Sequence, residues 1–170
     1  MLNDYVPLAL AINTEKARSE FIIAPVLAEV RRLMHYQVSL FSGVELVVEP
    51  EEGLTGPCDF VLSCSARQFV LTAPVLLVVE AKCDDINSGL GQCVAAVVAA
   101  QRFNERQGNP TTPIHGCVTT GNLWKFLELA GKVVAFGQGE YHIGQAGKIV
   151  AVLLSILKRH QGGDGDTGGA

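Results

Sequence analysis

Apolar side chains recur along this chain at two spacings, one typical of helices and the other of buried strands. Over residues 15–35 they fall every three or four positions, which predicts an amphipathic helix whose apolar side is formed by Phe21, Ala24, Leu27, Ala28, Val30 and Met34. Thr14 is suited to cap this helix, because its hydroxyl can accept a backbone N–H of the first turn. Pro25 removes one helical hydrogen bond, so a kink or a restart near Ala24 is expected.

Shorter runs rich in β-branched and other apolar residues predict strands. Six segments carry this pattern: residues 37–49, 57–65, 73–83, 114–119, 123–129 and 133–136. A turn is expected at residues 50–53, after the first of them. Gly121-Asn122 and Gly131-Lys132 are turn signals that join the last three.

Two more helices are predicted, at about 87–107 and 145–159. Asn87 or Ser88 is expected to cap the first of these, and Gly108 to end it. Because this helix separates the third and fourth strands, that strand pair is expected to be parallel. The order α-β-β-β-α-β-β-β-α therefore predicts an α/β fold, with a mixed central β-sheet flanked by helices.

The two ends of the chain carry weaker patterns. Residues 1–13 are predicted to form an irregular or loosely docked arm, and the Gly- and Asp-rich residues 161–170 a disordered tail. The chain has 170 residues, of which 48% are hydrophobic, so residues 1–160 are expected to form a single domain.

Composition narrows the classes of function. The formal net charge is -4, which argues against a protein that binds nucleic acid through bulk positive charge alone. The five cysteines show no CxxC pair and no zinc spacing. There is no leader pattern and no apolar stretch long enough to span a bilayer. We therefore expect a cytoplasmic protein with reduced thiols and no membrane partner.

The most apolar of the predicted strands ends in charged residues. Glu80-Ala81-Lys82 closes the run that begins at Pro74, and strand alternation points Glu80 and Lys82 to the same side. Asp59 lies in the preceding strand. Two carboxylates and one ammonium that converge at a strand end suit a site that holds a hard divalent cation and activates water.

Simpler interpretations stay open for these residues. Glu80 and Lys82 can form a strand-end ion pair, and Asp59 can cap a turn. The four histidines show no partner pattern, so ordinary surface or core positions are expected for them.

Five polar residues occur in a fixed order on the predicted elements: Glu20, Asp59, Glu80, Lys82 and Gln92. Asp59 follows Pro57 after one intervening residue, and Glu80 to Lys82 spells E-x-K at the end of the next strand. Over residues 15–136 this order resembles the PD-(D/E)xK nuclease superfamily, which has the restriction-endonuclease-like fold. Glu20 begins an E-x-x-I-x-P-x-L pattern similar to the helix opening of type I restriction-subunit nuclease domains. Gln92 lies in the first turns of the helix after Lys82.

The resemblance implies a restriction-endonuclease-like fold and a bound Mg²⁺, for which Mn²⁺ can substitute. Asp59 and Glu80 would be the first metal ligands. Glu20 would contribute directly or through water, and the carbonyl of Ala81 would add a ligand as the residue between Glu and Lys does in the family. Carboxylate and carbonyl oxygens are the ligands that Mg²⁺ prefers.

The catalytic residues expected from the resemblance are Asp59, Glu80, Lys82 and Gln92. Lys82 would orient the attacking water, and Gln92 would hold the phosphate or position Lys82. The expected function is metal-dependent hydrolysis of phosphodiester bonds in nucleic acid, with DNA as the expected substrate. A catalytically silent domain that serves as a nucleic-acid-binding or assembly module is the alternative. A homodimer or a partner subunit is also expected, because one small acidic chain offers no broad cationic surface.

Overall fold

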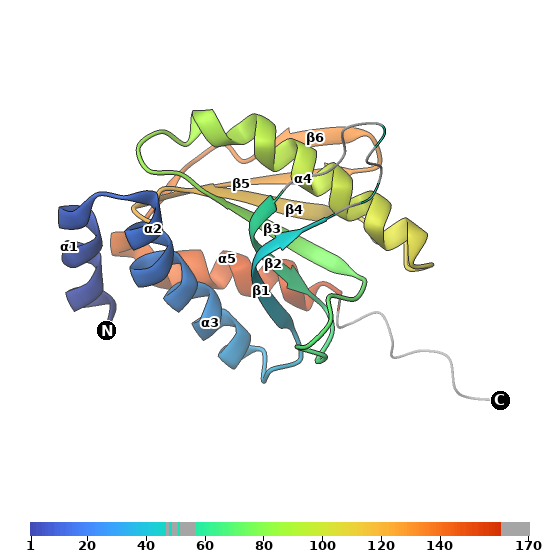
Figure 1. Cartoon of the computed structure of the whole chain (residues 1–170), viewed down its shortest axis with the longest axis horizontal. Coiled ribbons are helices and arrows are strands. Elements are labelled where there is room, and N and C mark those ends of the chain that lie inside the picture. Colours follow the sequence, from blue (N-terminus) through green and yellow to red (C-terminus); the bar gives the residue numbers. More distant parts are fainter. Residues whose placement is uncertain (47, 49–50, 52–56, 161–170) are drawn as a thin grey trace.

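A mixed β-sheet forms the centre of the molecule and carries helices on both faces (Figure 1). The computed structural model describes residues 1–46, 48, 51 and 57–160. The strands within this part of the chain are β1 (Ser39–Glu45), β2 (Pro57–Ser63), β3 (Val75–Ala81), β4 (Ile114–Thr119), β5 (Leu123–Ala130), β6 (Val133–Phe136) and β7 (Tyr141–His142). Strands β1 to β6 lie side by side in chain order, and β7 pairs with β5.

Strands β3 and β4 are parallel, whereas the other described pairs are antiparallel. Leu77 lies opposite His115 and Ala81 opposite Thr119, so both strands end at the same edge of the sheet. Helix α4 (Asn87–Arg106) connects them, because parallel neighbours need a crossover. The predicted α/β class, the mixed sheet with its helices and the parallel pair are therefore confirmed.

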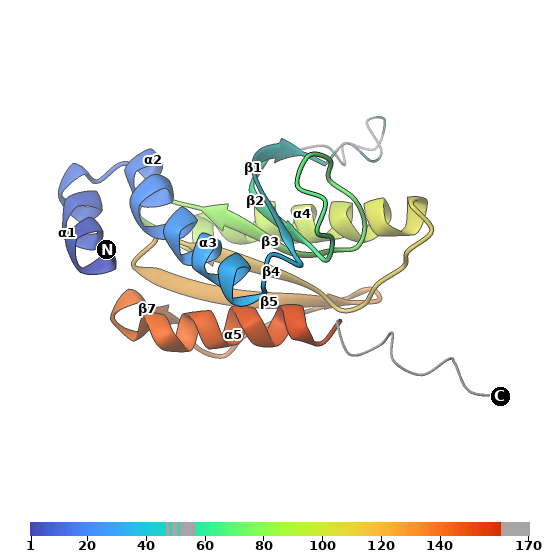
Figure 2. The ribbon, with the colours of Figure 1, turned by 90° about the horizontal axis from the view of Figure 1, so that it is seen from below.

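The helices divide between the two faces of the sheet. α4 covers one face, whereas α3 (Ala24–Leu33) and α5 (Ala146–Lys158) lie on the other (Figure 2). Strand β3 lies between these layers, and all of its residues are buried. Leu77, Val79 and Ala81 belong to the core beneath α3 and α5, whereas Val78 belongs to the core beneath α4. The same alternation turns Glu80 toward α4.

The N-terminal residues form a helix, so the prediction of an irregular arm at 1–13 is wrong. Helix α1 (Leu2–Ile12) buries Ala9 completely and packs Leu2 and Val6 against the core. These contacts outweigh the helix-weakening effect of Pro7, which lies inside the helix.

The helix predicted at 15–35 consists of three consecutive parts, which are α2 (Glu15–Arg18), the π-helical turn η1 (Ser19–Ile23) and α3. Thr14 caps the first part as predicted, because its hydroxyl accepts the Ala17 N–H at 3.1 Å. The restart at Ala24 is confirmed as well. Pro25 lies in the first turn of α3, where a missing N–H is tolerated.

Neither of the two residues predicted to cap α4 does so. Asp85 instead accepts the Asn87 N–H on its carboxylate at 2.9 Å, and its carbonyl accepts the Ser88 hydroxyl at 2.6 Å. An acidic side chain suits this place, because the first N–H groups of a helix point toward it. Gly108 follows the helix with a φ of 71°, as expected of a residue that ends a helix.

Several predicted strands are shorter in the structure than in the sequence pattern, and the two-residue β7 carries too little pattern to be predicted. The histidines occupy ordinary surface or core positions, as expected, with His115 buried and His142 exposed. His115 lies 3.4 Å from Glu128, and His142 accepts the Gly144 N–H at 3.0 Å.

Most of the turn predicted at 50–53 and the tail predicted at 161–170 fall outside the described residues. Within those that are described, no helix has the length and apolarity needed to cross a membrane.

Candidate active site at the end of strand β3

The centre of the candidate site is a buried acidic side chain. Glu80 lies near the end of β3 and is only 1% exposed. The Lys82 ammonium lies 3.1 Å from one of its carboxylate oxygens, Oε1, and is itself largely covered. The other oxygen, Oε2, is buried and has no hydrogen-bond partner among the described residues. A buried polar atom without a partner is uncommon, and a bound ion or water is one of the features that can account for it.

Asp59 reaches the same strand end from β2. Phe60 pairs with Val79 in the antiparallel ladder, which places Asp59 beside Glu80 one step further along. The Oδ2 atom of Asp59 accepts the Ala81 N–H at 2.7 Å, and this bond fixes the carboxylate at the end of β3. The predicted convergence of Asp59, Glu80 and Lys82 is therefore present in the structure.

The charges at this point act on the ionisation of Glu80. The pKa of Glu80 is raised to about 7, because burial and, after it, the charge of Asp59 raise it more than the hydrogen bond and charge of Lys82 lower it. An added cation would favour the charged form of this carboxylate. The pair Asp59 and Glu80, with one unpartnered oxygen, therefore fits a divalent cation bound by oxygen ligands.

Gln92 and Gly89 place the Lys82 side chain. The Lys82 ammonium donates to the Gln92 amide oxygen at 3.1 Å, so Gln92 joins the site as predicted. Gly89, in the first turn of α4, leaves room for the stem of the lysine. A Cβ atom built on Gly89 would lie 2.9 Å from Lys82 Cγ and 2.7 Å from Val118 Cγ1, both too close. The sequence signal for this role is a glycine inside a helix, where alanine is otherwise preferred.

Glu20, the fourth predicted metal ligand, does not contact Asp59, Glu80 or Ala81 among the described interactions. It is exposed on η1 and forms an ion pair with Lys16, with 3.2 Å between Nζ and Oε1. The described residues contain no group of three His, Cys, Asp or Glu side chains that could hold a metal ion. A direct set of Glu20, Asp59 and Glu80 is therefore not assembled, and a role for Glu20 through water stays a prediction. Ala81 is buried between the site residues, and a role for its carbonyl also stays a prediction.

A buried arginine, Arg18, supports this edge of the sheet. Arg18 donates to the carbonyl of Thr120 at 2.8 Å and to the side-chain oxygen of Asn13 at 2.8 Å. The Cys83 thiol, next to Lys82 in the chain, donates to the carbonyl of Asn13 at 3.4 Å. The contact from Arg18 to Thr120 spans 102 residues, so no local pattern could have indicated it.

Two cysteines near the site, Cys58 and Cys93, are buried. All five cysteines of the chain are free thiols. Burial raises the pKa of Cys58 to about 11 and that of Cys93 to about 12, and the charge of Glu80 contributes to both. Both thiols are therefore protonated at neutral pH and are poor nucleophiles or metal ligands.

Comparisons with known proteins found no family model, no curated protein and no solved structure that matches this chain. Function is therefore inferred from the side chains at the end of β3 and the chemistry they permit.

Proposed function

We propose that this chain is a metal-dependent nuclease that hydrolyses phosphodiester bonds, with DNA as its substrate. The observation that carries the proposal is the buried Glu80 carboxylate, which lies between Asp59 and Lys82 and has one oxygen without a partner. A pKa shifted by burial and by a like charge is typical of functional sites. We also propose that the α/β fold is of the restriction-endonuclease-like kind, since the motif residues lie on the strands and helix that this fold would assign to them.

Asp59 and Glu80 would hold the divalent cation, Mg²⁺ or Mn²⁺, and solvent and substrate oxygens would complete its ligands. When bound, such a cation supplies a water of lowered pKa and offsets negative charge on the phosphate. Two carboxylates are an ordinary number for Mg²⁺, which keeps several waters in enzymes that act on phosphates. The Ala81 N–H holds Asp59 in position for this role.

Lys82 and Gln92 would act on the substrate. The Lys82 ammonium, held between Glu80 and Gln92, has a third N–H direction with which to orient the attacking water or a phosphate oxygen. The amide oxygen of Gln92 accepts the hydrogen bond from Lys82, so the amide N–H groups of Gln92 remain to donate to the phosphate. In the net reaction the water oxygen bonds to phosphorus, one P–O ester bond breaks, and the leaving oxygen gains a proton.

The test is a cleavage assay on single-stranded DNA, double-stranded DNA and RNA, each with Mg²⁺, Mn²⁺ or a chelator. We expect DNA cleavage that requires the metal and that Lys82→Met reduces at least about a hundredfold. Lys148→Met is the matched control, because Lys148 is exposed on α5, and it should cleave at the normal rate. Nucleic-acid binding without cleavage under every condition would instead indicate the catalytically silent module. Cleavage that survives Lys82→Met would place the active site elsewhere.

A further inference from the structure

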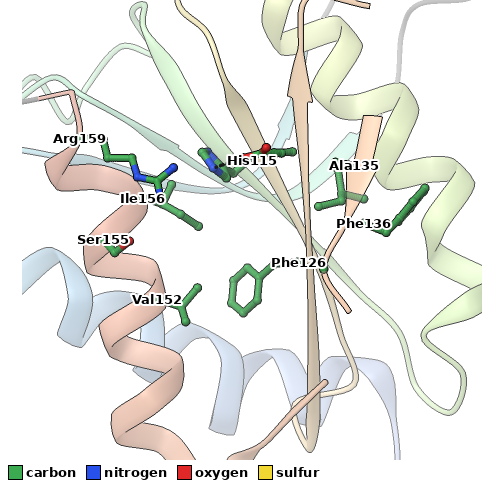
Figure 3. Close-up of a pocket in the computed structure, with 11 residues that line it drawn as sticks. His115, Phe126, Ala135, Phe136, Val152, Ser155, Ile156 and Arg159 are labelled. Atoms are coloured by element: carbon green, nitrogen blue, oxygen red, sulfur yellow. Dashed lines mark ion pairs between the residues drawn. The ribbon is translucent and has the colours of Figure 1, made fainter. Parts of the chain in front are cut away.

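A second group of polar side chains surrounds a pocket on the other face of the sheet, away from Glu80. The pocket lies between β4, β5 and β6 on one side and α5 on the other, and has a volume of about 270 Å³ (Figure 3). Its walls are mostly apolar, with Phe126, Val152 and Ile156 among them. Four side chains with hydrogen-bonding groups also line it: His115, Glu128, Ser155 and Arg159.

Hydrogen-bond donors lie on the helix side of this pocket. Val152, Ser155 and Ile156 of α5 and Arg159 directly after it follow one another at the spacing of a single helical face, and their side chains extend toward the strands (Figure 3). Arg159 forms no ion pair with any other described residue. A guanidinium beside a hydroxyl in a partly apolar pocket is suited to a carboxylate.

Hydrogen-bond acceptors lie on the strand side. His115 and Glu128 are direct neighbours across β4 and β5, and the imidazole Nε2 lies 3.4 Å from the carboxylate. Burial lowers the pKa of His115, so the ring is neutral at pH 7, and a proton on Nε2 faces Glu128. The second nitrogen, Nδ1, is then an acceptor, and it is buried without a partner among the described residues. The Glu128 carboxylate is therefore the acceptor that this side offers to an ammonium group, since Nδ1 is closed to solvent and lies on the far side of the ring from Glu128.

We propose that this pocket binds a small zwitterion with an apolar body, the chemistry of a free α-amino acid with an apolar side chain. The ligand carboxylate would lie against Arg159 and Ser155, the ammonium against Glu128, and the side chain against the apolar wall. The volume of about 270 Å³ is large enough for a molecule of the size of leucine, because a bonded carbon, nitrogen or oxygen occupies less than the roughly 30 Å³ of a water molecule. The site is separate from the proposed nuclease centre, because His115 and Glu80 project from opposite faces of the sheet.

The test is calorimetric titration of the whole chain with L-leucine, L-isoleucine, L-methionine and L-phenylalanine. At least one should bind one-to-one with a dissociation constant of about 1 mM or tighter. Two analogues of leucine separate its charged groups, since 4-methylpentanoate lacks the amine and isopentylamine lacks the carboxylate. Each should bind at least about tenfold more weakly than leucine. If none of the four amino acids binds, or if either analogue binds as tightly as leucine, the proposal is wrong.

A pair of neighbouring variants locates the binding. Arg159→Gln should weaken it at least about tenfold, and Lys158→Gln should leave it unchanged, because Lys158 lies outside the pocket. Both changes remove one positive charge from the end of α5, so any effect on the helix itself is matched. Glu128→Gln should weaken the binding of the amino acid and leave the binding of 4-methylpentanoate unchanged. Equal affinity in the two α5 variants would overturn the proposal, whatever the outcome of the cleavage assay.

Discussion

The Lys82 ammonium lies 3.1 Å from a carboxylate oxygen of Glu80, and the acid is the more deeply buried partner of the pair. The lysine reaches from the strand end toward α4, where Gln92 accepts a second hydrogen bond from it. Removing one partner of a buried ion pair leaves the other charge without compensation. The ionisation of Glu80 therefore depends on Lys82, and several measurable properties follow from that dependence.

The first prediction concerns stability against pH without metal. Burial raises the pKa of Glu80 to about 7 from its ordinary value of 4.5. Between pH 4.5 and 7 the Glu80 carboxyl is protonated in the folded state and ionised in the unfolded state. The free energy of unfolding should therefore fall as pH rises through this range to the folded pKa of about 7. The loss should be at most about 3 kcal/mol. Urea unfolding at pH 5, 6, 7 and 8 measures it, and Glu80→Gln should abolish this part of the dependence.

Burial lowers the pKa of His115 and His160, so their part of the stability rises with pH, and the difference between the normal chain and Glu80→Gln isolates the part of Glu80. The thiols of Cys58 and Cys93 are protonated throughout the range, because burial raises the pKa of both. Added Mg²⁺ should reverse the trend by binding the charged form, with a larger stabilisation at pH 8 than at pH 5.5. A stability that rises from pH 5 to 8 without metal, equally in Glu80→Gln, would contradict the assignment.

The second prediction concerns Lys82→Met. Lys82 lowers the pKa of Glu80, so the methionine variant should shift the pH dependence of stability to higher pH. The variant keeps the stem of the side chain and removes its charge. The midpoint of the pH curve, followed by urea unfolding, gives the direction, and an unchanged midpoint would show that the ammonium does not act on the carboxylate.

The third prediction ranks the three carboxylates in Mg²⁺ binding. Asp59→Asn and Glu80→Gln should each weaken Mg²⁺ at least about tenfold in a calorimetric titration, since each removes a charged ligand. Glu20→Gln should change the affinity less, because Glu20 is exposed and paired with Lys16. If Glu20→Gln binds Mg²⁺ as weakly as Glu80→Gln does, then Glu20 completes the metal site.

Local patterns were sufficient to predict strands β1 to β6 and the charged strand end. Period-two alternation places Glu80 and Lys82 on one side, and the ion pair between them confirms this. The parallel pairing of β3 and β4 follows from the intervening helix. The helix restart before Pro25 follows from the missing N–H of proline.

Contacts between distant residues could not be predicted from such patterns. Arg18 is buried by its bonds to Thr120 and Asn13, although arginine on its own predicts an exposed position. The pairing of His115 with Glu128 depends on the register of β4 and β5, which the turn at Gly121 sets. Helix α1 is stabilised by tertiary packing and not by its own propensity.

The fourth prediction is that the chain works as a homodimer or with a partner subunit. Its net charge of -4 gives one copy little cationic surface for a polyanion, and cutting both strands of a duplex needs two sites. Light scattering at micromolar concentration should therefore give roughly 36 kDa, twice the 18.1 kDa of one chain. A species of 18.1 kDa that stays unchanged when DNA is added would remove the homodimer.

The last prediction compares two glycines of α4. A Cβ on Gly89 would lie 2.7 Å from Val118 and 2.9 Å from Lys82, whereas a Cβ on Gly91 would meet nothing within 4 Å. Gly89→Ala should therefore destabilise the fold by about 1–3 kcal/mol through overpacking and displace Lys82. Gly91→Ala should stabilise it by about 0.5–1 kcal/mol, because alanine is favoured in an exposed helical position. Urea unfolding measures both changes.

Cleavage by the same two variants then tests the link between this contact and the chemistry. The lysine in Gly89→Ala must move away from its bonds to Glu80 and Gln92, so cleavage should fall at least about tenfold even where the variant is fully folded. Gly91→Ala keeps those bonds and should cleave at the normal rate. If Gly89→Ala remains folded and cleaves as fast as Gly91→Ala, then the position of Lys82 does not control the reaction, because the only difference between the two variants is the crowding of that side chain and its neighbour Val118.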